Sequence, residues 1–285
     1  MPKAVRQKRV TKTTLSKDGS VRSRIVPASS LSKGIKLLAY GRGKTGKTRL
    51  FSTFPKPALL LGTEDGTNSI ADIDGIDFLY LQHSDDMVGV IEVLKEGEYQ
   101  SVGLDTGGGF QEIIVKEALD LDEVPVQRTY GMGSGKFKDG RQMWGVVGLQ
   151  FKERLRRLID LADTQNINVM IIAHERNFQE EGDGHELITP TIGAALTPSV
   201  AGWLNGAVDY VCQTFIREQT NIVTQTIAGK KIKQKQKTGE MEYCLRIGPH
   251  PVYLTGFRVK KKVGDLPDSI VDPDYDKIMS LIEGS

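Results

Sequence analysis

The chain has 285 residues, 39% of them hydrophobic, and a formal net charge of +2. This length suits one large α/β domain or two small ones, and no run of about 18 apolar residues exists that would form a transmembrane helix. The basic, polar N-terminus lacks the apolar segment of a secretory signal. Cys212 and Cys244 are the only cysteines, and their separation lacks metal-ligand spacing, which favours a reducing, cytoplasmic setting.

The charge is distributed unevenly along the chain. Residues 1–36 contain ten Lys and Arg and one acidic residue, a net charge of +9, which leaves −7 for the remainder. Residues 1–30 show almost no apolar periodicity, so we expect a flexible basic arm followed by a single folded domain over residues 31–285. The arm either contacts the phosphates of a nucleic acid or is a solvated tail that aids solubility.

The first predicted strand, residues 35–40, leads into a glycine-rich sequence. Residues 41–48 match G-x-x-x-x-G-K-[ST] at every fixed position, and a helix is predicted from residue 48. Such a loop binds phosphates because its backbone N–H groups converge beside a helix N-terminus. Lys47 should reach the β- and γ-phosphates of ATP, and the Thr48 hydroxyl should ligate Mg²⁺. The predicted nucleotide-binding residues are Gly41, Arg42, Gly43, Lys44, Thr45, Gly46, Lys47 and Thr48.

The next elements alternate between strands and helices. A buried strand at residues 57–62 ends in a turn that contains Glu64, and a strand at 78–81 and a helix at 87–95 follow. The strand at 101–106 contains Asp105, 58 positions after Lys47, and is typical of a Walker B strand. The Asp105 carboxylate should hold Mg²⁺ through water.

The middle of the chain is predicted to contain two helices and a loop. The helices cover residues 111–121 and 142–162, and the glycine-rich, basic stretch 128–141 between them is predicted to be a mobile loop. On the second helix, the predicted inward residues are Val146, Leu149, Leu155, Leu158, Ile159 and Ala162, and the predicted outward residues are Lys152, Arg154, Arg156 and Arg157.

The remaining elements complete an α/β pattern. A buried strand at 168–173 ends at His174, a second long loop covers 176–200, and strands are expected at 207–216 and 242–247, with a helix at 274–283. The lysines of residues 230–237 indicate a basic, exposed strand or hairpin. Alternating strands and helices predict an α/β fold with a mostly parallel sheet flanked by helices, whose ligand lies at the carboxyl ends of the strands. Glu64, Asp105 and His174 all fall there.

The order of these parts resembles the RecA-like core P-loop ATPases. More narrowly, it is similar to phage-encoded nucleotide-binding proteins that act in single-strand annealing and recombination. The similarity covers roughly residues 34–275 and rests on residues 41–48, 63–66, 130–131, 171–175 and 264–268. It implies that Glu64 polarises the attacking water and that His174 senses the γ-phosphate. The alternatives are a surface turn acid and an ordinary strand-end histidine.

The resemblance also implies partners. The loops at 128–141 and 176–200 would lie where such proteins bind single-stranded DNA, although the second is acidic and has only Arg176 as a cation. It further implies a homo-oligomer, a ring or filament with ATP at subunit interfaces, and a single-strand-binding protein as an additional partner. The predicted DNA contacts are Arg128, Tyr130, Lys136, Phe137, Lys138 and Arg141, and Lys260, Lys261 and Lys262 are predicted trans-acting cations or a solvated basic edge.

The sequence therefore favours an ATP-hydrolysing, single-stranded-DNA-binding protein of the cytoplasm that promotes annealing or homologous recombination. Two alternatives stay open. One is a DNA motor of the helicase or packaging type, although 285 residues leave no room for an accessory helicase domain. The other is a nucleotide-gated module that binds a protein partner.

Overall fold

The computed structural model describes residues 22, 25, 27, 33–64, 66–120, 140–178, 191–227, 230–259 and 266–284. Its strands form one sheet in the order β10-β8-β7-β1-β5-β4-β2-β3, with β6 beside β5 and β9 beside β7. The parallel strands are β1 (Lys36–Gly41), β2 (Ala58–Gly62), β3 (Ile76–Tyr80), β4 (Ser101–Asp105), β5 (Asn168–Phe178) and β7 (Tyr210–Ile227). The strands with antiparallel partners only are β6 (Thr191–Ala194), β8 (Lys230–Arg246), β9 (Gly256–Phe257) and β10 (Ser269–Val271). The predicted mostly parallel α/β sheet is confirmed.

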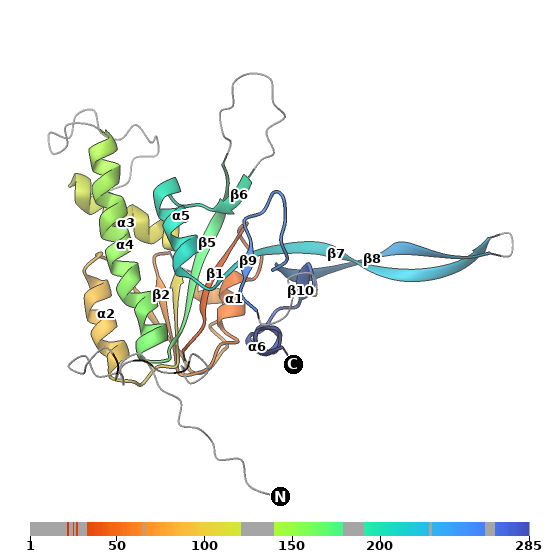
Figure 1. Ribbon diagram of the computed structural model, residues 1–285, viewed down its shortest axis with the longest axis horizontal. Coiled ribbons are helices and arrows are strands. Elements are labelled where there is room, and N and C mark those ends of the chain that lie inside the picture. Colours follow the sequence, from red (N-terminus) through yellow and green to blue (C-terminus); the bar gives the residue numbers. More distant parts are fainter. Residues whose placement is uncertain are drawn as a thin grey trace, which may run out of the picture.

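Helices cover both faces of this sheet (Figure 1). Alternate residues of a strand point to opposite faces, so Leu38 and Tyr40 of β1 join one buried cluster while Leu37 and Ala39 join the other. The first cluster packs under α2 (Asp86–Lys95), α3 (Gly107–Leu119), α4 (Gly140–Thr164) and α5 (Pro198–Ala207). The second packs under α1 (Lys47–Phe51) and α6 (Tyr275–Glu283), and a short 3₁₀ turn occupies Thr67–Ser69. None of the helices among the described residues has the length and apolar character to cross a membrane.

The predicted faces of α4 need two corrections. The buried stripe runs through Met143, Val147, Phe151 and Leu155 at intervals of four residues, whereas Leu149, predicted inward, is 69% exposed. Two residues on a helix correspond to about 200° of rotation, so Leu149 faces away from both Val147 and Phe151. Arg154, predicted outward, is only 17% exposed because its guanidinium pairs with Asp85 and donates to the Ser84 carbonyl.

The prediction of a single loop over residues 176–200 is wrong at both ends. β5 passes His174 and continues to Phe178, since it leaves the parallel sheet and pairs antiparallel with β6. A helix, α5, starts at Pro198 after Thr197, a common arrangement at the first helical position. α5 also contains Ala207, so the following strand begins at Tyr210 and not at residue 207. Residues 179–190 lie outside the described residues.

The predicted basic hairpin is confirmed. β7 and β8 pair antiparallel from Gln213↔Arg246 to Ile227↔Lys230, far beyond the edge of the sheet. Figure 1 shows this ribbon standing clear of the body. The register shifts between Glu218 and Thr220, and Gly239 in the facing strand has φ +84. This bulge separates an inner half, which belongs to the sheet, from a distal half, residues 220–237.

Candidate nucleotide-binding site

The strand ends that carry the predicted site residues meet at one edge of the sheet. Parallel register places Gly41 of β1 beside His174 of β5, and Asp105 of β4 beside Gly62 of β2 and Ile172 of β5. Glu64 follows β2 by two residues. The predicted common location of the phosphate-binding loop, Glu64, Asp105 and His174 therefore agrees with the fold.

The loop between β1 and α1 is curled around Lys47. The Lys47 side chain is buried, and its ammonium donates hydrogen bonds to the Gly41 carbonyl at 3.0 Å and to the Arg42 carbonyl at 2.6 Å. Gly46, immediately before the helix, has φ +83, a conformation that glycine adopts without strain. A side chain at Gly41 would meet the Thr214 carbonyl at 2.3 Å, so this position needs glycine to let β7 approach.

Residues of β7 and β5 hold the loop from the outside, and sequence reasoning missed them. The Thr45 hydroxyl donates to the Arg42 carbonyl at 2.8 Å and shares a 2.7 Å hydrogen bond with the Thr214 hydroxyl. The Arg42 guanidinium, 84% exposed, donates to the Glu175 carboxylate at 2.9 Å. Glu175 directly follows His174 in sequence, but nothing local signals its pairing with the loop.

Further hydrogen bonds link the Arg42–Glu175 ion pair to the β7–β8 hairpin. The Gln213 amide donates to the second Glu175 oxygen at 3.2 Å, and the Gln213 oxygen accepts from Arg246 at 3.0 Å. Arg246 lies over the rings of Phe215 and Tyr253, 4.6 and 4.8 Å from their centroids. A continuous polar chain therefore joins the phosphate-binding loop to the inner half of β8.

Thr48 and Asp105 form the pair that fits a magnesium site. The Thr48 hydroxyl donates to Asp105 Oδ2 at 2.7 Å. Burial raises the pKa of Asp105, while the Thr48 hydrogen bond and the charge of Lys47 counteract this rise. A hydroxyl and a carboxylate oxygen at this distance suit Mg²⁺, which binds few protein oxygens and completes its shell with water and phosphate. Among the described residues, no group of three or more His, Cys, Asp or Glu offers an alternative metal site.

Glu64 and His174 lie within electrostatic reach of this pair. The charge of Glu64 raises the pKa of Asp105, and that of His174 lowers it. Glu64 also counteracts the effect of burial, which lowers the pKa of Lys47. Both side chains are exposed. Glu64 lines a pocket of about 450 Å³ with Glu112 of α3.

Thr63 and Thr106 form a hydrogen-bonded clamp next to Glu64. The Thr63 hydroxyl accepts from the Thr106 N–H at 3.0 Å, and the Thr106 hydroxyl caps α3 by accepting from the Gly109 N–H at 3.0 Å. The α3 helix begins at Gly107 and not at the predicted residue 111, because its glycines let the helix end approach Thr63. A Cβ at Gly109 would lie 2.1 Å from the Thr63 hydroxyl oxygen.

Gly109→Ala is expected to destabilise the protein by about 1–3 kcal/mol, because the added methyl group displaces Thr63. It should also slow ATP turnover, because Thr63 adjoins Glu64. Chemical denaturation measures the first effect and a turnover assay the second. The matched control is Gly202→Ala in α5, where a Cβ meets nothing within 4 Å, and it should stabilise by about 0.5–1 kcal/mol. Equal unfolding free energies for the two variants would contradict the close packing of Gly109 against Thr63.

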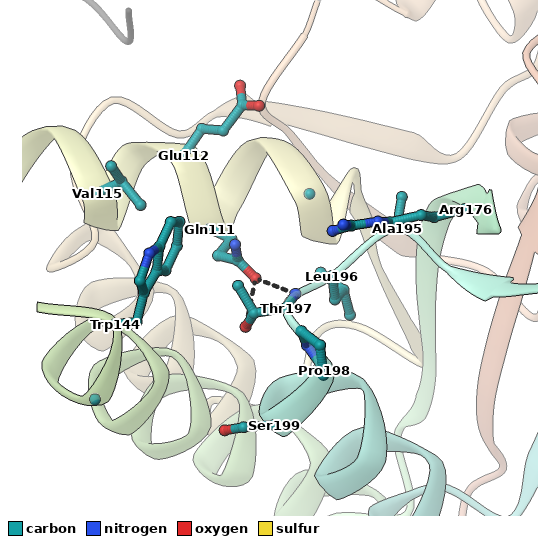
Figure 2. A pocket seen from close by; sticks show the side chains of 12 residues that line it. Gln111, Glu112, Val115, Trp144, Arg176, Ala195, Leu196, Thr197, Pro198 and Ser199 are labelled. Atoms are coloured by element: carbon teal, nitrogen blue, oxygen red, sulfur yellow. Dashed lines mark hydrogen bonds between the residues drawn. The ribbon is translucent and has the colours of Figure 1, made fainter. Parts of the chain in front are cut away.

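A second, larger pocket of about 580 Å³ is also lined by Glu112 (Figure 2). It is lined by α3, by the start of α4, by Arg176 of β5 and by the segment from β6 to α5. The Gln111 side-chain oxygen accepts from the Thr197 N–H at 3.0 Å and joins α3 to that segment. Half-buried Trp144 and exposed Arg176 lie at opposite ends of the pocket. Neither was foreseen as part of a pocket.

Several predicted site residues fall outside the described residues and remain predictions. They are Arg128, Tyr130, Lys136, Phe137 and Lys138 in the first predicted DNA loop, and Lys260, Lys261 and Lys262 as trans-acting cations. Arg141 belongs to the first turn of α4, but its side chain is not described.

Comparison with known proteins places the chain in a family. No curated protein matches the chain. A family described as an AAA domain matches residues 33–258, which include the phosphate-binding loop, Asp105 and His174. The chain therefore belongs to the AAA domain family, and its domain is a nucleotide-binding domain of the P-loop ATPase type.

Proposed function

We propose that this protein binds and hydrolyses ATP with Mg²⁺ and couples this cycle to the binding of single-stranded DNA, so that it promotes annealing or recombination. The observation that supports the ATPase activity best is the arrangement of Lys47, Thr48 and Asp105 at the carboxyl end of β1 and β4. As the resemblance to RecA-like proteins implies, the active form is a homo-oligomer with ATP at its interfaces and one of Lys260, Lys261 or Lys262 acting in trans.

Each residue has a distinct role in the proposed reaction. The N–H groups of residues 43–48 bind phosphate oxygens at the start of α1. The Lys47 ammonium exchanges its carbonyl partners for the β- and γ-phosphates, and Thr48 and Asp105 hold Mg²⁺. When bound, Mg²⁺ neutralises the charge that develops on the phosphates. Glu64 orients the attacking water, and His174 donates a hydrogen bond to the γ-phosphate.

The DNA-binding part of the proposal is supported by the pocket in Figure 2. Single-stranded nucleic acid is bound by cations that contact its backbone and by aromatic rings that stack on its bases. Trp144 and Arg176 supply these two groups within one pocket. The pocket shares Glu112 with the pocket that Glu64 lines, so DNA bound there lies next to the ATP site.

Trp144→Ala is expected to weaken binding of a labelled poly-dT oligonucleotide by about 1–3 kcal/mol, the value of one stacked base. Fluorescence anisotropy at fixed salt measures this change. The matched control is Trp203→Ala, which removes the other tryptophan, also half-buried but located on α5 outside the pocket. An equal loss of affinity in both variants, or in neither, would remove the pocket from the DNA-binding surface.

A further inference from the structure

The distal half of the β7–β8 ribbon has an unusual charge. Residues 220–237 contain five lysines and no aspartate or glutamate. The inner half differs, because it contains acidic residues, and Glu242 pairs with Arg217 there while Glu218 pairs with Lys237 at the start of the distal half. Soluble surfaces commonly have charges of both signs interspersed. The complete absence of acids over 18 positions therefore indicates a surface for a polyanion.

The register arranges four of these lysines in a row. Lys231, Lys233, Lys235 and Lys237 occupy alternate positions of β8, so they belong to one face of the ribbon. Their cross-strand partners on that face are Thr226, Thr224, Ile222 and Thr220, which carry no charge. Successive members of the row are about 6.6 Å apart and the row is about 20 Å long, as the rise of a strand requires.

The ribbon is also accessible around residues 236–240, where its distal half begins. Residues 236–240 are exposed, and the Lys237 side chain is 74% exposed although its ammonium lies 2.8 Å from Glu218. Such a surface ion pair contributes little to stability, so Lys237 can exchange Glu218 for another anion. Figure 1 shows that the distal ribbon extends away from the other labelled elements.

We propose that the row Lys231, Lys233, Lys235 and Lys237 binds the phosphate backbone of a nucleic-acid strand, independently of its sequence. This inference rests on the proposed function, because single-stranded DNA is the ligand. It adds a second contact, because β7 and β8 lie on one side of β1 in the sheet while β5, which carries Arg176 of the Trp144 pocket, lies on the other. The inner half of β8 connects the distal half of the ribbon to the ATP site. The Tyr243 ring lies 3.2 Å from the position that a Cβ at Gly46 would occupy, and Arg246 starts the polar chain to Arg42.

The test replaces all four lysines with glutamine and measures poly-dT affinity as a function of salt. Each lost phosphate contact should lower the slope of log K against log[salt] by about 0.7, roughly 3 in total, with a loss of affinity of roughly 100-fold at 0.15 M salt. A second variant, with four arginines in place of the lysines, should retain both slope and affinity. The matched control replaces four exposed cations of the body, Lys95, Arg156, Arg157 and Lys277, with glutamine and loses the same charge.

The possible results separate the two proposals. An unchanged slope in the four-lysine variant, or an equal change in the body variant, would overturn the proposed role of the lysine row while leaving DNA binding intact. Loss of self-association without loss of DNA affinity, measured by light scattering, would also overturn it and make the ribbon a subunit contact. If the wild-type protein binds no poly-dT at low salt, the proposed function itself fails.

Discussion

Lys47→Ala is expected to lower the rate of ATP hydrolysis by about 10²–10³-fold or more, the usual effect of removing one preorganised charge from an active site. Lys47 is the buried cation at the start of α1, and its ammonium already points at the carbonyls that line the phosphate-binding loop. Burial lowers its pKa, but the charges of Asp105, Glu175 and Glu64 oppose that shift. A neutral methyl group cannot contact the phosphates, so ATP affinity should fall as well.

Turnover assays and calorimetric ATP titrations measure these two effects. Arg49→Ala is the matched control, since it removes an exposed cation from the same short helix, two residues away. It should hydrolyse ATP at close to the wild-type rate. Wild-type turnover in the Lys47 variant would mean that the active site lies elsewhere.

Glu64→Gln is expected to reduce turnover by about 10²–10³-fold with ATP binding retained. The amide keeps the shape of the side chain but cannot act as the negative partner of an attacking water. This separates an ATPase from a nucleotide-gated binding module, because a module that depends on ATP binding alone would tolerate the change. Single-turnover hydrolysis and equilibrium ATP binding, measured side by side, distinguish the two.

The structure provides a demanding control for Glu64. Glu112 lines the same pocket from α3, but it is not among the charges that shift the pKa of Lys47 or Asp105, whereas Glu64 is. Glu112→Gln should therefore change turnover little. If the Glu112 variant loses activity and the Glu64 variant keeps it, the carboxylate that orients water comes from α3, and the role assigned to Glu64 is wrong.

Local sequence patterns predicted the elements that end at the site. Residues 35–48 combine an apolar run, a fixed glycine spacing and a helix start, and each signal lies within a few positions of the next. The strands that lead to Glu64 and Asp105 are short, almost fully buried runs, and their predicted bounds agree with the structure to within one residue. The start of α3 was missed because three consecutive glycines are typical of a loop, and only the packing against Thr63 explains them.

The parts that escaped prediction depend on contacts between distant residues. Thr214 bonds to Thr45 across 169 positions, and Glu175 bonds to Arg42 across 133, so no local pattern reports either pair. The continuation of β5 beyond His174 depends on β6, a strand of four residues that is too short to stand out in the sequence. The polar chain from the phosphate-binding loop to Arg246 exists only once β1, β5, β7 and β8 lie side by side.

We expect ATP turnover at the Lys47 site to respond to single-stranded DNA. The most direct measurement is the steady-state rate of ATP hydrolysis with and without poly-dT, in Mg²⁺, with the Lys47→Ala variant as the blank. The wild-type rate should rise when DNA is added, and the variant should show no hydrolysis. A wild-type rate that stays the same at DNA concentrations where binding is complete would contradict the coupling.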